Sequence, residues 1–285
     1  MKKFLVVFLV FACAQWCFAA ETPTVKGRVL LVASSTDSLE LKDHRVVPTG
    51  YFLDELAVPA QALIAAGYEV IVATPGGKTP VMDQHSNTVA LFQNNQAALD
   101  KALNFINTYP SMLNPITIQQ AVKDGLENFD AVYVPGGHAP INDLMQDKAF
   151  GDVLRHFHAT GKPTGLLCHG PIALIAALDN PSEFRKAMVD EDFDAQKKYG
   201  AGWQYAGYHM TIYSNAEEYS VERYILEGKM PFYVADALQV AGGIVESGPL
   251  DQTIVVPMSR TKKGRKRDMV KNIEDRIITR TSRVG

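Results

Sequence analysis

The fold is decided by residues 164–178, which read TGLLCHGPIALIAAL. Residues 164–167 are largely apolar and do not alternate with polar residues, which is typical of a strand buried on both faces of a sheet. Cys168 follows this strand directly, Gly170 permits a tight bend, and an apolar helix is expected over residues 172–178. A strand that turns sharply into a helix matches the second half of a nucleophile elbow, with cysteine in place of serine. The sequence therefore predicts that Cys168 projects from the edge of a sheet.

The rest of the chain repeats this alternation of strand and helix. Strands are expected at residues 28–33, 69–74, 130–134, 209–214, 243–246 and 253–256. Helices are expected at residues 59–66, 96–106, 116–127, 141–160, 216–226 and 231–241, and residues 181–202 are expected to form a polar excursion between elements. Apolar strands that alternate with helices predict one α/β domain over residues 20–285, with a mostly parallel sheet covered on both faces. Sites in such domains lie at the carboxyl ends of the strands, where both the Pro-Gly-Gly turn at 135–137 and Cys168 fall.

Composition and charge narrow the class of protein. The chain has 285 residues, of which 47% are hydrophobic and 21% charged, so it can bury a large core without disulfide bonds. The formal net charge of −3 argues against a nucleic-acid partner. Six basic side chains lie in residues 260–267, but no aromatic residues interleave with them, and we interpret the run as a solvated loop.

The first residues predict export. Residues 1–19 begin with a methionine and two lysines, continue as an apolar run and end in small residues, which is the order of a secretory signal peptide. The apolar run is short for a membrane span and Gln15 interrupts it. We expect cleavage before Ala20 and a periplasmic or secreted protein. Lipid attachment at Cys13 is the less favoured alternative, because the bulky Phe11 departs from a lipobox.

Signal cleavage would change the cysteine count. It would remove Cys13 and Cys17 and leave Cys168 as the one cysteine of the chain. Thiols in exported proteins are usually paired, so a lone thiol is either buried and inert or kept for its reactivity. The count alone leaves both readings open. The helix expected after Cys168 would direct its N-terminal N–H groups at the sulfur, which favours a reactive thiolate.

Together these motifs resemble the DJ-1/PfpI superfamily of the class I glutamine amidotransferase-like fold, and within it the Hsp31-like glyoxalase III and chaperone branch. The resemblance spans residues 27–256 and rests on residues 49–56, 66–70, 73–77, 130–138, 167–171, 213–218 and 231–256. It implies a flavodoxin-like three-layer sandwich with a mostly parallel central sheet and a nucleophile elbow. It also implies a homodimer that needs no cofactor and no metal.

The resemblance implies four catalytic side chains. Cys168 matches the family nucleophile, and His169 matches the adjacent histidine. Glu55 matches the carboxylate that hydrogen-bonds the cysteine, although as a first-turn carboxylate of a helix it could serve only the helix dipole. Glu218 matches the acidic residue that orients the histidine, although the neighbouring pattern from Ser214 predicts a helix cap.

The resemblance also implies backbone and pocket roles. Gly137 and the backbone N–H of His169 match an oxyanion hole, which would stabilise the oxygen of an attacked carbonyl. Gly136 lies in the same turn. His138 either lines the pocket or completes that turn, and the sequence leaves the two open.

The function expected from this set is a cofactor-independent cysteine enzyme that acts on small reactive carbonyls. The resemblance favours conversion of methylglyoxal to D-lactate, or a deglycase activity on glycated substrates. One alternative is an amidase or peptidase with a triad of Cys168, His169 and Glu218. Another is a holdase chaperone or a redox sensor without turnover. Neither nucleic acid nor a membrane span is expected.

Overall fold

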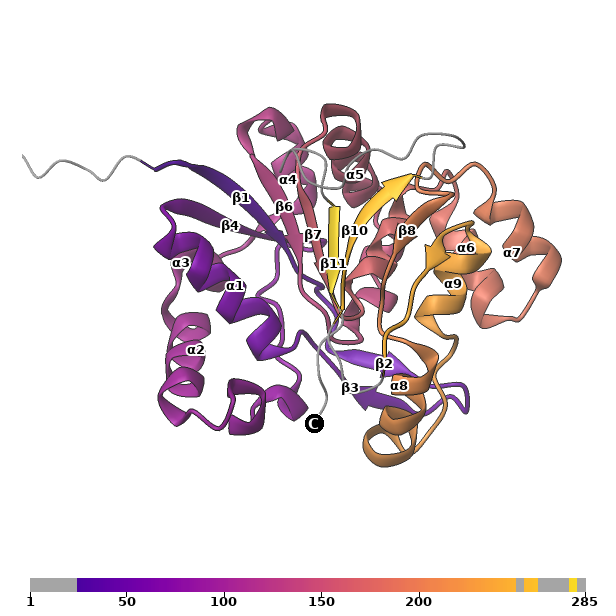
Figure 1. Ribbon diagram of the computed structural model, residues 1–285, viewed down its shortest axis with the longest axis horizontal. Helices are drawn as coiled ribbons and strands as arrows, with labels where there is room; N and C mark the ends of the chain where they lie inside the picture. The colour runs from indigo at the N-terminus through magenta and orange to yellow at the C-terminus, as the bar shows by residue number, and fades with distance from the viewer. Residues whose placement is uncertain (1–24, 250–253, 261–276, 281–285) are drawn as a thin grey trace, which may run out of the picture.

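The computed structural model describes residues 25–249, 254–260 and 277–280. Within these residues the chain forms one nine-stranded sheet and one two-stranded ribbon, with helices packed around the large sheet (Figure 1). The strands are β1 (Gly27–Val32), β2 (Ser38–Glu40), β3 (Val46–Pro48), β4 (Tyr68–Thr74), β5 (Ile116–Thr117), β6 (Ala131–Val134), β7 (Thr164–Leu167), β8 (Tyr208–Met210), β9 (Ile244–Val245), β10 (Val255–Arg260) and β11 (Ile277–Arg280). The α-helices are α1 (Leu53–Ala65), α2 (Gln96–Thr108), α3 (Pro110–Leu113), α4 (Ile118–Lys123), α5 (Lys148–Thr160), α6 (Pro181–Val189), α7 (Phe193–Gly200), α8 (Asn215–Val221) and α9 (Val234–Val240). The 3₁₀ helices are η1 (Gln84–Ser86), η2 (Val89–Phe92), η3 (Leu126–Asn128), η4 (Ala139–Ile141), η5 (Leu144–Gln146) and η6 (Gly170–Ala177), and η7 (Glu222–Leu226) is a π-helix.

The large sheet is mostly parallel. Its strands follow the order β5-β4-β1-β6-β7-β11-β10-β8-β9, and β1 pairs in parallel with β4 on one side and with β6 on the other. Among the described strands of this sheet, β10 alone is antiparallel to its neighbours, β11 and β8. The predicted α/β fold with a mostly parallel central sheet is therefore confirmed.

Both faces of the sheet are buried. Leu31 of β1 belongs to an apolar cluster that includes Leu56 of α1 and other residues of α1 and α2. The adjacent Leu30 belongs to a second cluster, which includes Phe150 of α5 and the apolar residues of η6. Successive side chains of a strand point to opposite faces, so a strand covered on both sides must be apolar at every position. This is why the strands read as unbroken apolar runs.

Several elements differ from the expected ones. Helix α1 begins at Leu53 rather than near Pro59, so Pro59 lies inside the helix. The polar stretch 181–202 is not merely a loop, because it forms α6 and α7, which pack on each other. The segment after the elbow is the 3₁₀ helix η6, which begins at Gly170 and ends at Ala177.

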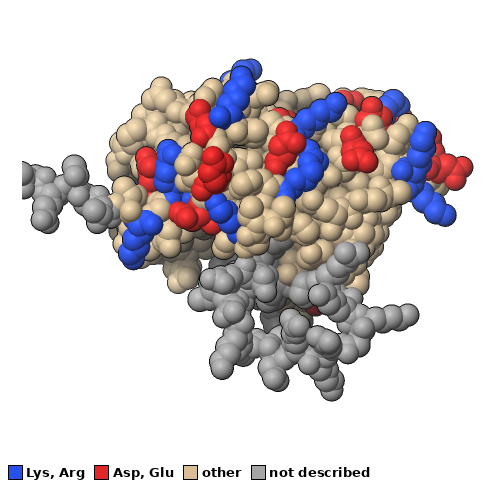
Figure 2. Space-filling model, turned by 90° about the horizontal axis from the view of Figure 1, so that it is seen from above, with Lys and Arg blue, Asp and Glu red and all other residues tan. Residues whose placement is uncertain are grey.

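Two expectations concern the ends of the chain. The predicted signal peptide at 1–19 and most of the basic run at 260–267 lie outside the described residues, and Arg260 is the last residue of β10. None of the helices that the structure describes is long and apolar enough to cross a membrane. The face at the top of Figure 1 carries basic and acidic side chains side by side (Figure 2).

Candidate active site

The elbow at Cys168 is strained. Cys168 adopts a φ of 57°, a left-handed conformation that residues other than glycine rarely take, directly after β7. A side chain at Gly170 would lie 2.8 Å from the carbonyl oxygen of Val134, so only glycine fits this bend. The carbonyl of Cys168 accepts a hydrogen bond of 3.0 Å from the backbone N–H of Tyr213. The sharp turn presents the sulfur at the carboxyl end of β7, as the sequence predicts.

His169 lies against the sulfur. Its Nδ1 is 3.1 Å from Sγ of Cys168, and its ring stacks on Tyr213 with a centroid distance of 4.4 Å. The stacking fixes the plane of the imidazole. Burial, together with nearby Cys168 and Glu218, raises the pKa of Tyr213, so its hydroxyl stays neutral and adds no charge beside the imidazole.

Glu218 orients His169 from the opposite side. Its Oε2 accepts a hydrogen bond of 2.7 Å from Nε2 of His169. The capping box at the start of α8 joins Ser214 to Glu217, so the neighbouring Glu218 is left to face inward. Burial favours the neutral acid, but the charges and hydrogen bonds of His138 and His169 outweigh it and hold the pKa of Glu218 well below its usual range. Glu218 is therefore a buried carboxylate.

Glu55 lies in the first turn of α1 and is anchored to the Pro-Gly-Gly turn at 135–137. Its Oε2 accepts a hydrogen bond of 2.9 Å from the backbone N–H of Gly136. Pro59 has no N–H to offer the carbonyl of Glu55 four residues earlier. The hydroxyl of Tyr133 takes that place and donates a hydrogen bond of 2.5 Å to the Glu55 carbonyl. Because Pro59 leaves the Glu55 carbonyl without a partner in the helix, Tyr133 of β6 can bind that carbonyl and hold Glu55 in place.

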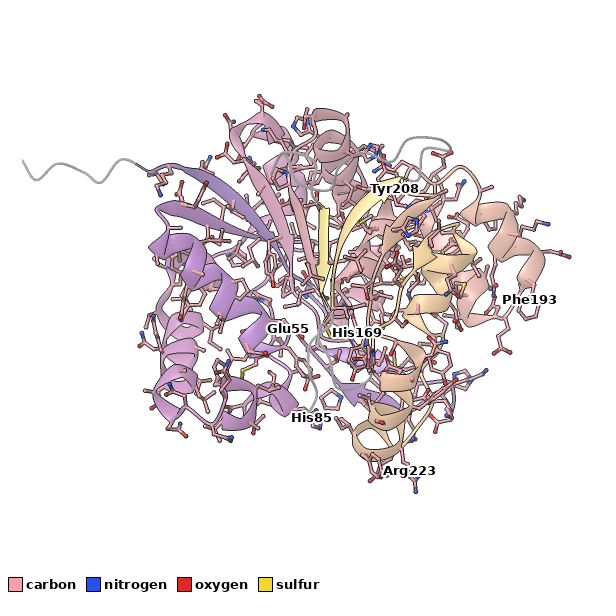
Figure 3. All side chains as sticks on the ribbon, in the orientation of Figure 1. Glu55, His85, His169, Phe193, Tyr208 and Arg223 are labelled. Atoms are coloured by element: carbon pink, nitrogen blue, oxygen red, sulfur yellow. The ribbon has the colours of Figure 1, made fainter. Side chains whose placement is uncertain are left out.

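Cys168 and Glu55 meet at Gly136. A Cβ atom at Gly136 would lie 2.4 Å from both Cβ of Cys168 and Oε2 of Glu55, so the two side chains close over this glycine. The next residue, Gly137, has a φ of 86°, and a Cβ there would lie 2.1 Å from the carbonyl oxygen of Gly50. Figure 3 shows Glu55 and His169 near each other at the lower ends of the strands.

His138 is the residue whose role sequence reasoning left open. Its Nε2 lies 2.9 Å from Oε1 of Glu218, the oxygen that His169 does not use. The two imidazole rings lie 4.3 Å apart, and both are buried. His138 therefore belongs to the hydrogen-bonded site as well as to its turn. No sequence signal links His138 to Glu218, which is 80 residues away.

A narrow pocket leads to the sulfur. Its polar lining is made by Cys168, His169, His138, Tyr213, Asp83 and His85, and its apolar lining by Pro48, Phe52, Val221, Ile225 and Leu226. Cys168 is 3% exposed. No lysine or arginine is among the lining residues. The pocket therefore suits a small uncharged molecule better than a phosphate or a carboxylate.

The same side chains could be considered for a metal. Possible ligand atoms of His138, His169 and Glu218 lie within 4.8 Å of one another. Each histidine Nε2 is already hydrogen-bonded to its own oxygen of Glu218, so the three satisfy one another. The arrangement is that of a hydrogen-bonded triad that serves Cys168. We assign no metal to it.

The structure brings together all the residues that the sequence singled out. Cys168, His169 and Glu218 form a continuous chain of contacts, and the carboxylate of Glu55, from α1, lies with Cβ of Cys168 against Gly136. A thiol beside an imidazole can become a nucleophile, and the carboxylate opposite fixes the imidazole tautomer. His169 follows Cys168 in the chain and Gly137 follows Gly136, but the oxyanion role of their backbone N–H groups stays a prediction. The site can carry out thiolate attack on a carbonyl followed by proton transfer.

Fold and site define an α/β protein with a cysteine at a nucleophile elbow. The model of the DJ-1/PfpI family matches residues 46–182, which include Glu55, Gly136 and Cys168 and end before Glu218. The family resemblance that the motifs indicated is therefore confirmed, and the chain is DJ-1/PfpI-like.

Named relatives lie in the branch that the motifs indicated. Glutathione-independent glyoxalase hsp3101 of Schizosaccharomyces pombe is 30% identical over 164 residues, which cover 58% of this chain and 64% of that protein. Protein/nucleic acid deglycase HchA of Pseudomonas aeruginosa is 25% identical over 231 residues, which cover 78% of this chain and 70% of that protein. Among solved structures, Rapid Encystment Protein 24 kDa of Francisella tularensis superposes on this chain with a TM-score of 0.62. The match covers 90% of this chain and 92% of that one, and the two sequences are 21% identical. This structural likeness shows the fold.

Proposed function

We propose that this protein is a cysteine-dependent enzyme that converts small 2-oxoaldehydes such as methylglyoxal to 2-hydroxy acids such as D-lactate. The observation that carries the proposal is Cys168 on a strained elbow, 3.1 Å from the Nδ1 of His169. The resemblance to a glutathione-independent glyoxalase supports the substrate class. The narrow pocket without a cationic side chain supports a small uncharged substrate.

The first half of the reaction forms a bond to sulfur. His169 takes the thiol proton of Cys168, and the thiolate attacks the aldehyde carbon to give a hemithioacetal. His169 gives that proton to the former aldehyde oxygen, so the hemithioacetal carries no charge and the imidazole is neutral again. Glu55 then removes the hydrogen from the former aldehyde carbon as a proton, the electron pair forms a carbon–carbon double bond, and the neighbouring ketone oxygen takes the negative charge of an enediolate.

The second half moves the proton and frees the product. The hydroxyl proton on the hemithioacetal carbon passes to the enediolate oxygen, and Glu55 returns its proton to the neighbouring carbon. The hemithioacetal carbon thereby becomes the carbonyl of a thioester to Cys168. Water attacks the thioester, the sulfur leaves as a thiolate, and 2-hydroxy acid is released. The sum is one 2-oxoaldehyde and one water converted to one hydroxy acid, which requires no external oxidant or reductant.

A second candidate is deglycation of glycated amines or thiols. The longer alignment with a protein/nucleic acid deglycase favours it. It would use the same thiolate on the carbonyl end of the adduct. Because Cys168 is 3% exposed at the end of a narrow pocket, a small free adduct is favoured over one on a folded macromolecule.

A Cys-His-Glu triad is also the arrangement of an amidase, and Glu55 separates the two chemistries. Isomerisation needs a group that moves a proton between two carbons, which is the role we give Glu55. Amide hydrolysis needs only Cys168, His169 and Glu218. We expect Glu55→Gln to abolish D-lactate formation. An amidase would instead lose activity in Glu218→Gln and keep most of it in Glu55→Gln.

The proposal is tested by incubating the purified protein with methylglyoxal and measuring D-lactate. We expect turnover by the wild type and none above background in Cys168→Ala. Tyr109→Phe serves as a control, since its hydroxyl bonds the Val70 carbonyl outside the site. D-lactate formation that survives Cys168→Ala would contradict the proposal. Suppression of client aggregation without any turnover would favour the chaperone alternative.

A further inference from the structure

One carboxylate serves two histidines in this site. Glu218 accepts a hydrogen bond from His169 on Oε2, at 2.7 Å, and from His138 on Oε1, at 2.9 Å. His169 comes from the elbow after β7, His138 from the turn after β6, and Glu218 from α8. All three side chains are buried. The His138 contact is not needed for a Cys-His-Glu triad, so it calls for an explanation of its own.

Hydrogen-bond chemistry fixes both tautomers. An ionised carboxylate only accepts, so each Nε2 must carry a hydrogen. Nδ1 of His169 is then the atom that faces Sγ of Cys168 at 3.1 Å. As a neutral ring, His169 has a lone pair there and can accept the thiol proton. As an imidazolium, it has a hydrogen on Nδ1 and cannot act as a base for the thiol.

Burial limits the charge that the three groups can share. With both histidines neutral, the group would bury an uncompensated carboxylate. With both protonated, it would bury a net positive charge. A buried charge is costly unless it is paired, so one proton on the two imidazoles is the favoured state. The remaining question is which of the two rings holds it.

The surroundings favour His138. Besides Glu218, two carboxylates lie near His138. Asp83 lines the same pocket and is hydrogen-bonded to His85, and Glu55 is hydrogen-bonded to the backbone N–H of Gly136, two residues before His138. His169 instead faces Glu218, His138, the thiol of Cys168 and the ring of Tyr213. His138 therefore has more negative groups around it than His169 has.

The pKa directions agree with this geometry. Burial works against the charged form of His138, but Glu218, Asp83 and Glu55 outweigh it and raise the pKa of His138. Burial and the charge of His138 lower the pKa of His169, against the pull of Glu218.

We propose that His138 is a positioning residue that takes the positive charge opposite Glu218, so that His169 stays a neutral base for the thiol of Cys168. Without His138, Glu218 would attract a proton onto His169 alone. With His138 protonated, Glu218 can orient the imidazole of His169 without drawing a second proton onto it. The inference rests on the proposed function, because a neutral base is what thiol activation requires.

The test is an NMR titration of ¹⁵N-labelled imidazoles in the wild type and in His138→Gln. Glutamine can still donate a hydrogen bond but carries no charge. In the wild type we expect His138 to be an imidazolium and His169 a neutral Nε2–H tautomer at pH 7. In His138→Gln we expect the midpoint of His169 to rise by about one pH unit, the scale of one charge at short range. The surface variant His44→Gln, which also removes a histidine bonded to a glutamate, should leave His169 unchanged.

Activity supplies a second readout. We expect the acidic limb of the D-lactate rate against pH to move upward by about the same unit in His138→Gln. An imidazolium His169 at pH 7 in the wild type would overturn the proposal, and this measurement needs no variant. An unchanged His169 midpoint in a folded His138→Gln would overturn it as well. A wild type that forms no D-lactate would instead contradict the proposed function, while the NMR titration still tests His138.

Discussion

At the scale of single residues, the site depends on groups that hold a reactive side chain in place. Glu55 is an example, because its carboxylate binds Gly136 and its carbonyl binds Tyr133. The carbonyl is available only because Pro59 has no N–H. A proline inside a helix normally costs stability. Here the carbonyl that Pro59 leaves free accepts the hydrogen bond that anchors Glu55, a candidate catalytic residue.

Tyr133→Phe tests this anchor. It removes the hydroxyl that satisfies the Glu55 carbonyl, and we expect a loss of about 1 kcal/mol in the free energy of unfolding by urea. Tyr109→Phe removes a similar hydroxyl from the Val70 carbonyl and should cost about as much. Only Tyr133→Phe should slow alkylation of Cys168, because only it frees Glu55. Equal alkylation rates in the two variants would contradict the anchoring role.

Glu218→Gln tests the buried charge. Glu218 has a lowered pKa in the folded protein, so its stabilising effect is present above the unfolded value of about 4.3 and is lost as the pH falls through the folded value. We expect Glu218→Gln to lose about 3 kcal/mol at pH 7, because it breaks a buried ion pair. The difference from the wild type should shrink between pH 4 and pH 2. Urea unfolding at pH 7 and pH 3 measures it, and a pH-independent difference would show that Glu218 is not the charged partner.

At the scale of elements, two Pro-Gly-Gly turns follow parallel strands but differ in function. A side chain at Gly136, after β6, would strike Cys168 and Glu55, whereas one at Gly76, after β4, would meet nothing closer than 3.6 Å. The sequence motif is the same in both. The site is made by the neighbours of the turn, which come from α1 and the elbow.

Gly136→Ala and Gly76→Ala form a matched pair. We expect Gly136→Ala to lose about 2 kcal/mol of stability through overpacking and D-lactate activity by roughly 100-fold through displacement of Cys168. Gly76→Ala should change both by little. The comparison uses thermal unfolding and the D-lactate assay. Near-wild-type activity in Gly136→Ala would show that Cys168 and Glu55 do not need to meet there.

Much of this architecture follows from local sequence patterns. The unbroken apolar runs predicted β1, β4, β6 and β7 to within a residue or two, because burial on both faces leaves no other pattern. The predicted start of α1 near Pro59 is wrong. Pro59 lies inside the helix, because the hydroxyl of Tyr133 replaces the hydrogen bond that a proline cannot donate to the Glu55 carbonyl. Helices α6 and α7 were missed because their surfaces are polar. The bond between His138 and Glu218 was out of reach, because it joins segments that only the tertiary fold brings together.

At the scale of the whole molecule, the compartment and the assembly stay predictions. We propose that residues 1–19 direct export and that the mature chain begins at Ala20. Expression of the full chain in a bacterium, followed by cell fractionation and N-terminal sequencing, checks this. A product that keeps Met1 in the cytoplasm would contradict it. The expected homodimer is checked by sedimentation of the same product.

The whole account depends on an ionised sulfur at Cys168, so its titration is the most direct test. The rate of iodoacetamide alkylation should be measured against pH, with mass spectrometry of the Cys168 peptide as the readout. The account predicts an inflection below the free-cysteine reference of about 8.5, because the elbow presents the sulfur to the N-terminal end of η6, which favours the thiolate. An inflection at or above that reference would contradict the account.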